Sequence, residues 1–124
     1  MRVLLIDDSA VDREIIGGIF REVGIDVMEA EDGSTARLVF SQSTPCVIFL
    51  DWSLKRGMTG LDLLRTIRRD PLKGTLPVIV MLGIPSAEQE RSAWKEGASW
   101  VWVKKNDLGV FEREFRIMRD FVRL

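Results

Sequence analysis

The sequence contains no histidine and only one cysteine, Cys46. The lack of histidine excludes Ser-His-Asp and Cys-His catalysis, and it excludes metal sites built on imidazole. A single cysteine cannot form a disulfide within the chain, which is typical of proteins from a reducing compartment. We expect Cys46 to be a small buried apolar side chain. Carboxylates, hydroxyls and amines are left to supply any chemistry.

The sequence also lacks an excess of charge of either sign and any long apolar run. Its 18 basic and 19 acidic residues give a net charge of −1, without the basic block that indicates a nucleic-acid partner. The first apolar run ends at Asp7, too early for a signal peptide or a membrane span. We expect a cytoplasmic protein that binds neither nucleic acid nor membrane. With 46% hydrophobic residues, residues 1–124 should form a single domain with a packed core.

Two continuous apolar runs, each ending in acidic residues, organise what is present. Residues 3–6 are followed by Asp7 and Asp8, and residues 46–50 are followed by Asp51. Each run is typical of a strand buried on both faces. Because burying an unpaired ionised carboxylate is very costly, the acids must emerge where the strands end. Further strands are expected over residues 25–30, 77–82 and 99–103, the last of which is followed by Lys104.

Helical spacing of apolar residues separates these strands. Ser9 or Asp12 is a candidate N-cap of the first helix, which should end at Gly24, and Ser86 has the capping-box spacing to Gln89. Five strands that alternate with five helices predict an α/β fold, with a parallel sheet covered by helices on both faces. The helices are expected over residues 9–23, 34–40, 60–69, 86–96 and from a cap at Asn106 or Asp107 nearly to Leu124.

The last helix carries two apolar stripes and leaves two interpretations open. The helix is either buried over a broad face, or it presents its second stripe to a dimer mate or another partner. The stripe expected to face the core is Leu108, Phe111, Phe115, Met118 and Val122, and the second is Val110, Ile117 and Phe121. In the helix over residues 60–69 the inner face should be Leu61, Leu64 and Ile67.

The charged strand ends predict one functional site, because ligands bind at the carboxyl edge of a parallel sheet. If the first and third strands are neighbours, Asp8 and Asp51 can reach the same ion. Oxygen ligands without histidine or cysteine suit Mg²⁺, and Lys104 would add a positive charge opposite. A metal and an ammonium around one carboxylate suit phosphoryl transfer with Asp51 as the nucleophile. Each residue alone has an ordinary explanation, as a turn, a helix cap or a surface lysine.

The chain resembles the receiver domains of bacterial two-component response regulators over essentially its whole length. The resemblance implies a flavodoxin-like (βα)5 three-layer sandwich, whose parallel five-stranded sheet has the order 2-1-3-4-5. The matching motifs follow the family's order and are residues 3–8, Asp51, residues 60–62, residues 77–82, Gly97-Ala98 and Lys104.

The resemblance also implies roles for individual residues. Asp51 matches the phosphoacceptor, Asp8 a direct metal ligand, and Asp7 a ligand that acts through water. Ser53 lies where the family supplies a backbone carbonyl to Mg²⁺, and Lys104 matches the lysine that pairs with the phosphoryl group. The implied donor is a phosphohistidine on a histidine kinase or phosphotransfer protein. The signal would pass to a downstream protein target or a fused output domain.

One departure from the family concerns the hydroxyl residue that follows the fourth strand and bonds a phosphoryl oxygen. Its position here is Leu82 or Gly83, neither of which has a side chain that can donate a hydrogen bond. Ser86 is the nearest hydroxyl that could substitute for it. The usual contact between this position and the phosphoryl group is therefore expected to be missing.

Two more departures lie on and after the fifth strand. The family's aromatic switch falls on Val101, and strand alternation should point Trp100 and Trp102 to the opposite face. The family's lysine-proline step, usually a cis bond, is Lys104–Lys105. We expect a trans bond here, because a cis bond without proline costs about 3–4 kcal/mol.

Three functions are consistent with these residues. The first is a receiver that is phosphorylated on Asp51 with Mg²⁺, catalysing its own phosphorylation and slow hydrolysis without being a metabolic enzyme. The second is a phosphorylation-independent interaction module, which the missing hydroxyl and aromatic residues favour. The third is a phosphatase of the haloacid dehalogenase type, which is disfavoured because Ser53 stands where that family needs a second acid.

Overall fold

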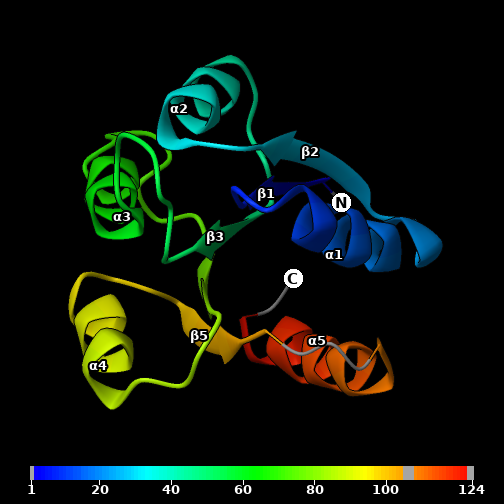
Figure 1. Ribbon diagram of the computed structural model, residues 1–124. Helices are drawn as coiled ribbons and strands as arrows, with labels where there is room; N and C mark the ends of the chain where they lie inside the picture. The colour runs from blue at the N-terminus through cyan, green and yellow to red at the C-terminus, as the bar shows by residue number, and fades with distance from the viewer. Residues whose placement is uncertain (1, 105–107, 123–124) are drawn as a thin grey trace.

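Five strands and five helices alternate along the chain in the computed structural model, which describes residues 2–104 and 108–122 (Figure 1). The helices cover both faces of one central sheet, as the sequence predicts. In chain order the elements are β1 (Arg2–Ile6), α1 (Ala10–Glu22), β2 (Asp26–Ala30), α2 (Gly33–Gln42), β3 (Val47–Asp51), α3 (Gly60–Arg68), β4 (Val78–Leu82), α4 (Ala87–Lys95), β5 (Trp100–Val103) and α5 (Leu108–Val122).

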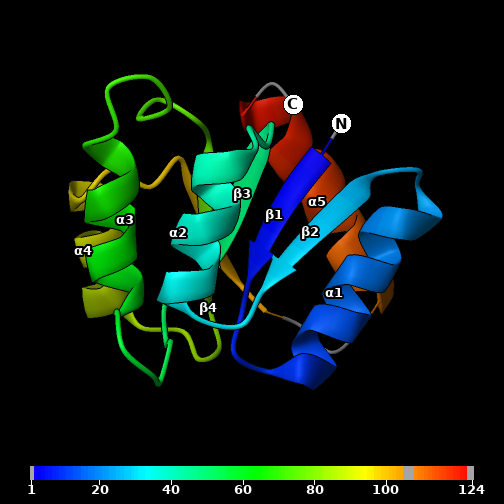
Figure 2. The same ribbon diagram turned by 90° about the horizontal axis from the view of Figure 1, so that it is seen from above.

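The sheet is parallel and has the strand order β2-β1-β3-β4-β5, which confirms the flavodoxin-like topology. Figure 2 shows β1 and β2 side by side with their ends pointing the same way. In the β1–β3 pairing Ile6 is opposite Leu50. The next residues, Asp7 and Asp51, therefore emerge at the same level of the carboxyl edge.

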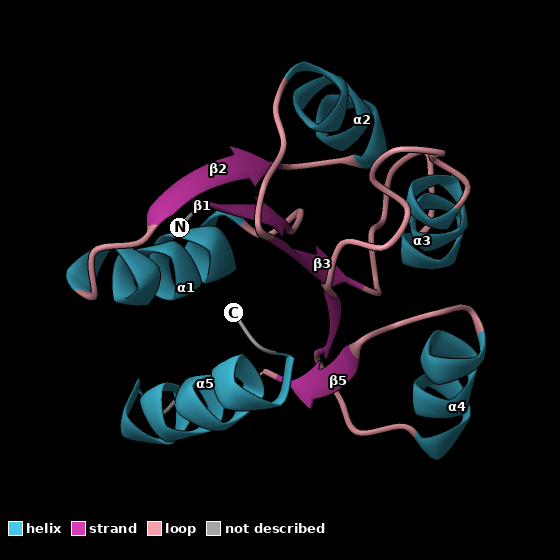
Figure 3. Cartoon of the chain, turned by 180° about the vertical axis from the view of Figure 1, so that it is seen from behind, coloured by secondary structure: helices cyan, strands magenta, loops and turns pink. Residues whose placement is uncertain are grey.

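Strand alternation divides the core into two clusters, one on each face of the sheet. Helices α1 and α5 cover one face, and α2, α3 and α4 cover the other (Figure 3). On the first face the ring of Phe20 lies 4.9 Å from that of Phe49 and 5.0 Å from that of Phe115, measured between centroids. On β1, Val3 and Leu5 face this cluster, and Leu4 and Ile6 face the other.

The helix ends follow the local sequence. The Ser9 hydroxyl accepts a hydrogen bond from the Asp12 backbone N–H, which identifies Ser9 as the N-cap of α1. Gly24 follows that helix with a φ of 80°, a left-handed conformation that favours glycine. Ser86 caps α4 by accepting from the Gln89 N–H. These capping predictions are confirmed.

Two burial predictions are wrong. Cys46 is exposed, because β3 begins one residue later and Cys46 precedes the strand. Its backbone N–H donates a hydrogen bond to the Arg2 carbonyl. In α3 the inner face includes Leu63, which is buried, whereas Leu61 is only half-buried. Leu63 and Leu64 both pack in the core with Ile67, so the buried face of the helix is centred on these residues and not on Leu61.

In α5 the described part of the core stripe is buried as predicted: Phe111, Phe115 and Met118. In the second stripe Ile117 is 59% exposed and Val110 is half-buried, so the broadly buried interpretation does not hold at Ile117. The other predicted members, Leu108, Phe121 and Val122, have side chains outside the described residues. The Lys104–Lys105 bond and the cap at Asn106 or Asp107 also lie outside them. Within residues 2–104 and 108–122 there is no helix with the length and apolar character needed to cross a membrane.

Candidate functional site

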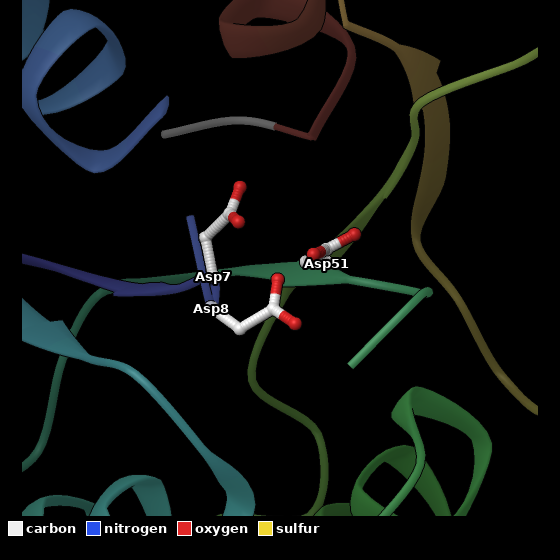
Figure 4. A group of neighbouring side chains, drawn as sticks. All are labelled: Asp7, Asp8 and Asp51. Atoms are coloured by element: carbon white, nitrogen blue, oxygen red, sulfur yellow. The ribbon is translucent and has the colours of Figure 1, made fainter. Parts of the chain in front are cut away.

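Three carboxylates meet at the carboxyl edge of the sheet (Figure 4). Asp7 and Asp8 directly follow β1, and Asp51 is the last residue of β3. One carboxylate oxygen from each lies within 4.8 Å of the others. Asp7 is fully buried and Asp51 is 3% exposed, while Asp8 is half-buried. The structure thus brings together the acids that the sequence predicts at these strand ends.

Backbone N–H groups of the segments after β1 and β3 donate hydrogen bonds to the three acids and hold them in place. Such bonds partly offset the cost of burying a carboxylate, and they fix its direction. The loop after β3 is tied to the end of β1 in this way, since one bond joins residues that are far apart in the chain. The bonds are Ser9 N–H to Asp7 Oδ1 (3.0 Å), Ser53 N–H to Asp51 Oδ1 (3.1 Å) and Lys55 N–H to Asp8 Oδ2 (3.1 Å).

The start of α3 packs directly against the backbone of Asp51 and Trp52. A Cβ added to Gly60 would lie 2.8 Å from the Trp52 Cα and 2.9 Å from the carbonyl oxygens of Asp51 and Trp52. Thr59 and Asp62 form a complete capping box at this end of the helix. Only glycine therefore permits this approach, which fixes the turn that carries Asp51.

Lys104 faces the acids from the end of β5. Its backbone N–H donates to the Leu82 carbonyl, and its side chain is 16% exposed. The ammonium Nζ donates to Asp7 Oδ2 at 3.0 Å and to Asp12 Oδ2 at 2.9 Å, and it lies 3.7 Å from Asp51 Oδ1. The sequence pattern predicts Asp12 only as a possible N-cap of the first helix. Its position in the first turn of α1, at the same sheet edge, is the signal that could have revealed it.

The charges at this edge are out of balance. Burial and the charge of Asp7 together raise the pKa of Asp51 to about 7, against the opposing effects of Lys104 and the Ser53 N–H. Burial works against the charged form of Lys104, but the hydrogen bond to Asp12 and the charges of Asp51 and Asp7 outweigh it and raise the lysine pKa. One ammonium thus faces several carboxylates. The all-oxygen donor set and the missing positive charge fit a divalent cation such as Mg²⁺.

Ser53 and Ser86, the two serines predicted to take part in the site, lie beside it. Ser53 is exposed in the turn after β3, and the role of its backbone carbonyl as a metal ligand stays a prediction. Ser86 lines a pocket together with Trp52 and Ser53, and its hydroxyl is used to cap α4.

Leu82 or Gly83 stands at the position where the resemblance predicts a hydroxyl residue, and Val101 stands where it predicts an aromatic residue. Leu82 is buried in the core cluster under α2, α3 and α4, and Val101 packs against the same cluster. Trp100 and Trp102 belong to the cluster on the other face, which confirms the predicted alternation. A Cβ added to Gly83 would meet nothing within 4 Å. The space beside the end of β4 is therefore open.

Comparison with known proteins agrees with this geometry. The family model of the response regulator receiver domain matches residues 3–114. The chain is 33% identical to the chemotaxis protein CheY of Pseudomonas aeruginosa over 105 residues, which cover 84% of each chain. The structure of the chemotaxis response regulator CheY4 of Vibrio cholerae has a TM-score of 0.85 at 22% identity and covers 94% of this chain and 97% of its own.

A further structural neighbour is the Thermotoga maritima response regulator protein TrrA in complex with Mg²⁺-BeF, which has a TM-score of 0.79 at 23% identity over 94% of this chain and 97% of its own. These neighbours share the order of strands and helices and confirm the fold. The sequence matches decide the family, because the receiver model spans most of the chain and CheY is a relative over nearly its whole length. The chain belongs to the response regulator receiver domain family, the CheY-like signalling modules of two-component systems.

Proposed function

We propose that this receiver domain accepts a phosphoryl group on Asp51 in a Mg²⁺-dependent reaction and passes the signal on by protein contact. One observation carries the proposal: the buried Asp51 carboxylate lies within reach of both Asp7 and Asp8 and 3.7 Å from the Lys104 ammonium. Phosphoryl transfer needs this combination of a nucleophile, anionic metal ligands and a fixed positive charge.

Asp7, Asp8, Asp51 and the backbone carbonyl of Ser53 would hold the Mg²⁺. When bound, the ion supplies the positive charge that offsets the oxygens of the transferred group. TrrA, a neighbour in fold, binds Mg²⁺ and BeF. The cluster of three acids supports the same ion chemistry in this chain.

The chain's own residues perform the transfer. An ionised oxygen of Asp51 attacks phosphorus, the bond to the donor breaks, and the bonding electrons leave with the donor. Lys104 keeps its proton and donates a hydrogen bond to the phosphoryl oxygens, so it acts as a fixed charge and not as a base. Attack of water on the same phosphorus releases phosphate and restores the Asp51 carboxylate. This self-catalysed turnover does not make the domain a metabolic enzyme.

The proposed donor is a phosphohistidine on a histidine kinase or phosphotransfer protein, and the proposed recipient is a downstream protein or an output domain in the same chain. The apolar packing at Leu82 and Val101 leaves no hydroxyl-to-aromatic relay at these positions. The loop that follows Asp51 and is tied to Asp8 through Lys55 is a direct alternative route for the signal. A homodimer remains a prediction.

Intact-mass spectrometry after incubation with acetyl phosphate and Mg²⁺ tests the proposal. We expect the addition of one phosphoryl group to the wild type and to Asp26→Asn, which changes an exposed acid at the opposite edge of the sheet. Asp51→Asn should abolish the addition. If saturating donor and Mg²⁺ leave the wild type unmodified, the proposal is wrong, and an interaction module that works without phosphorylation is the better explanation.

A further inference from the structure

Lys104 has a carboxylate partner outside the metal cluster. Its Nζ lies 2.9 Å from Asp12 Oδ2 and 3.0 Å from Asp7 Oδ2, but 3.7 Å from Asp51 Oδ1. Asp12 stands on α1, and its side chain is 36% exposed, against 4% for that of Asp51. The ammonium is therefore held by Asp7 and Asp12, and it is not within hydrogen-bond distance of the acceptor carboxylate.

A group added to Asp51 can receive a hydrogen bond from Lys104 only if the ammonium is redirected. The lysine stem is flexible, so its head can move between partners. Losing the ammonium would cost the fully buried Asp7 more than Asp12, because water cannot reach a buried carboxylate to solvate it. Asp12 can be solvated instead, because a partly exposed ion pair is weak. Asp12 is therefore the partner that Lys104 releases.

The basic neighbour of Asp12 does not neutralise it. Arg13 directs its Nη1 to the Asp7 backbone carbonyl at 2.6 Å and its Nε to Glu29 at 3.3 Å. Arg13 therefore binds groups at the end of β1 and on β2. The carboxylate of Asp12 pairs with Lys104. The contact between Asp12 and Lys104 joins α1 to the end of β5 across 92 residues of sequence.

We propose that Asp12 is a positioning residue that competes with a phosphoryl group on Asp51 for Lys104, and so weakens the site's affinity for that group. The inference rests on the proposed function. Asp12 is not a member of the cluster of Asp7, Asp8 and Asp51, and in this proposal it acts through the ammonium of Lys104. Removing its charge should free Lys104 for the phosphoryl oxygens.

Beryllofluoride, a tetrahedral mimic of the phosphoryl group, provides the test at saturating Mg²⁺ with isothermal titration calorimetry. Asp12→Asn should bind it more tightly than the wild type, by up to about fivefold, the upper end of what a partly exposed ion pair contributes. Asp12→Ala should change the affinity in the same direction, so the test does not depend on one variant. Asp12→Glu restores the carboxylate and should return the affinity toward the wild-type value.

Glu14→Gln is the matched control, because it removes the same charge from an exposed position of the same helix. Its affinity should equal that of the wild type. Unchanged or weaker binding by the Asp12 variants would overturn the inference, as would equal tightening in Glu14→Gln, which would reveal a general effect of net charge. A wild type that binds no beryllofluoride would instead refute the proposed function.

Discussion

Replacing Asp51 with asparagine should stabilise the fold at neutral and alkaline pH, although it removes the proposed acceptor. Burial and the charge of Asp7 raise the pKa of Asp51 from 3.8 to about 7. Between these two values the folded protein holds a proton that the unfolded chain has released. The stability contributed by this group is therefore fully present below about pH 4, and it is lost as the pH rises through 7.

The size of the effect follows from the shift. A difference of about three pKa units at about 1.4 kcal/mol per unit gives an upper limit of about 4 kcal/mol for the cost of ionising Asp51 in the fold. Asparagine keeps the shape of the side chain and an oxygen that can accept the Ser53 N–H. Above pH 8 we expect a gain of about 2–4 kcal/mol in the free energy of unfolding, which shrinks toward zero near pH 4.

Urea unfolding followed by circular dichroism at several pH values, without divalent ions, measures this difference. Asp26→Asn is the control, and its difference from the wild type should show little change with pH. Mg²⁺ should stabilise the wild type more than Asp51→Asn, because a ligand of the folded state adds RT ln(1 + [L]/Kd). The reasoning is refuted if Asp51→Asn is no more stable than the wild type at pH 8.5, or if its advantage does not grow with pH.

Three other measurements check separate parts of the structure. Gly60→Ala should lower the free energy of unfolding by about 2 kcal/mol or more, because the added Cβ meets backbone atoms at 2.8–2.9 Å. Gly18→Ala, which has open space around it, should be neutral or stabilising in the same urea assay. Equal unfolding midpoints for the two variants would contradict the close packing at Gly60. Phe20→Ala should cost about 3–5 kcal/mol, because Phe20 contacts rings on both β3 and α5, and a loss below 1 kcal/mol would argue against that core. Mg²⁺ should change the tryptophan fluorescence through Trp52, and an unchanged Mg²⁺ midpoint in Asp8→Ala would contradict the prediction that Asp8 is a ligand.

Much of the fold could be read from local patterns. The apolar runs before Asp7 and Asp51 define strands buried on both faces, and their acidic ends define the edge of the sheet. Strand order came from resemblance to the receiver family, because periodicity alone does not say which strands are neighbours. The positions of Trp100, Trp102 and Val101 followed from alternation along one strand.

The errors arise where tertiary packing decides. The sequence places Asp12 in the first turn of α1 at the same sheet edge, but its pairing with Lys104 depends on how α1 sits against the end of β5. Cys46 was expected to be buried because it continues an apolar run, yet β3 begins at Val47. In α3 the choice between Leu61 and Leu63 depends on a small rotation of the helix. Sequence periodicity identifies a face but does not fix its centre.

The bond between Asp8 and the Lys55 backbone N–H has a consequence for how the domain communicates. Asp8 has only two carboxylate oxygens, and one already fastens the segment that follows β3. An ion that binds the same carboxylate would therefore change the strength of the hydrogen bond that holds this segment. Thermodynamic linkage makes this effect mutual. If such an ion weakened the binding of a partner protein to this segment, that partner would weaken the binding of the ion by the same factor.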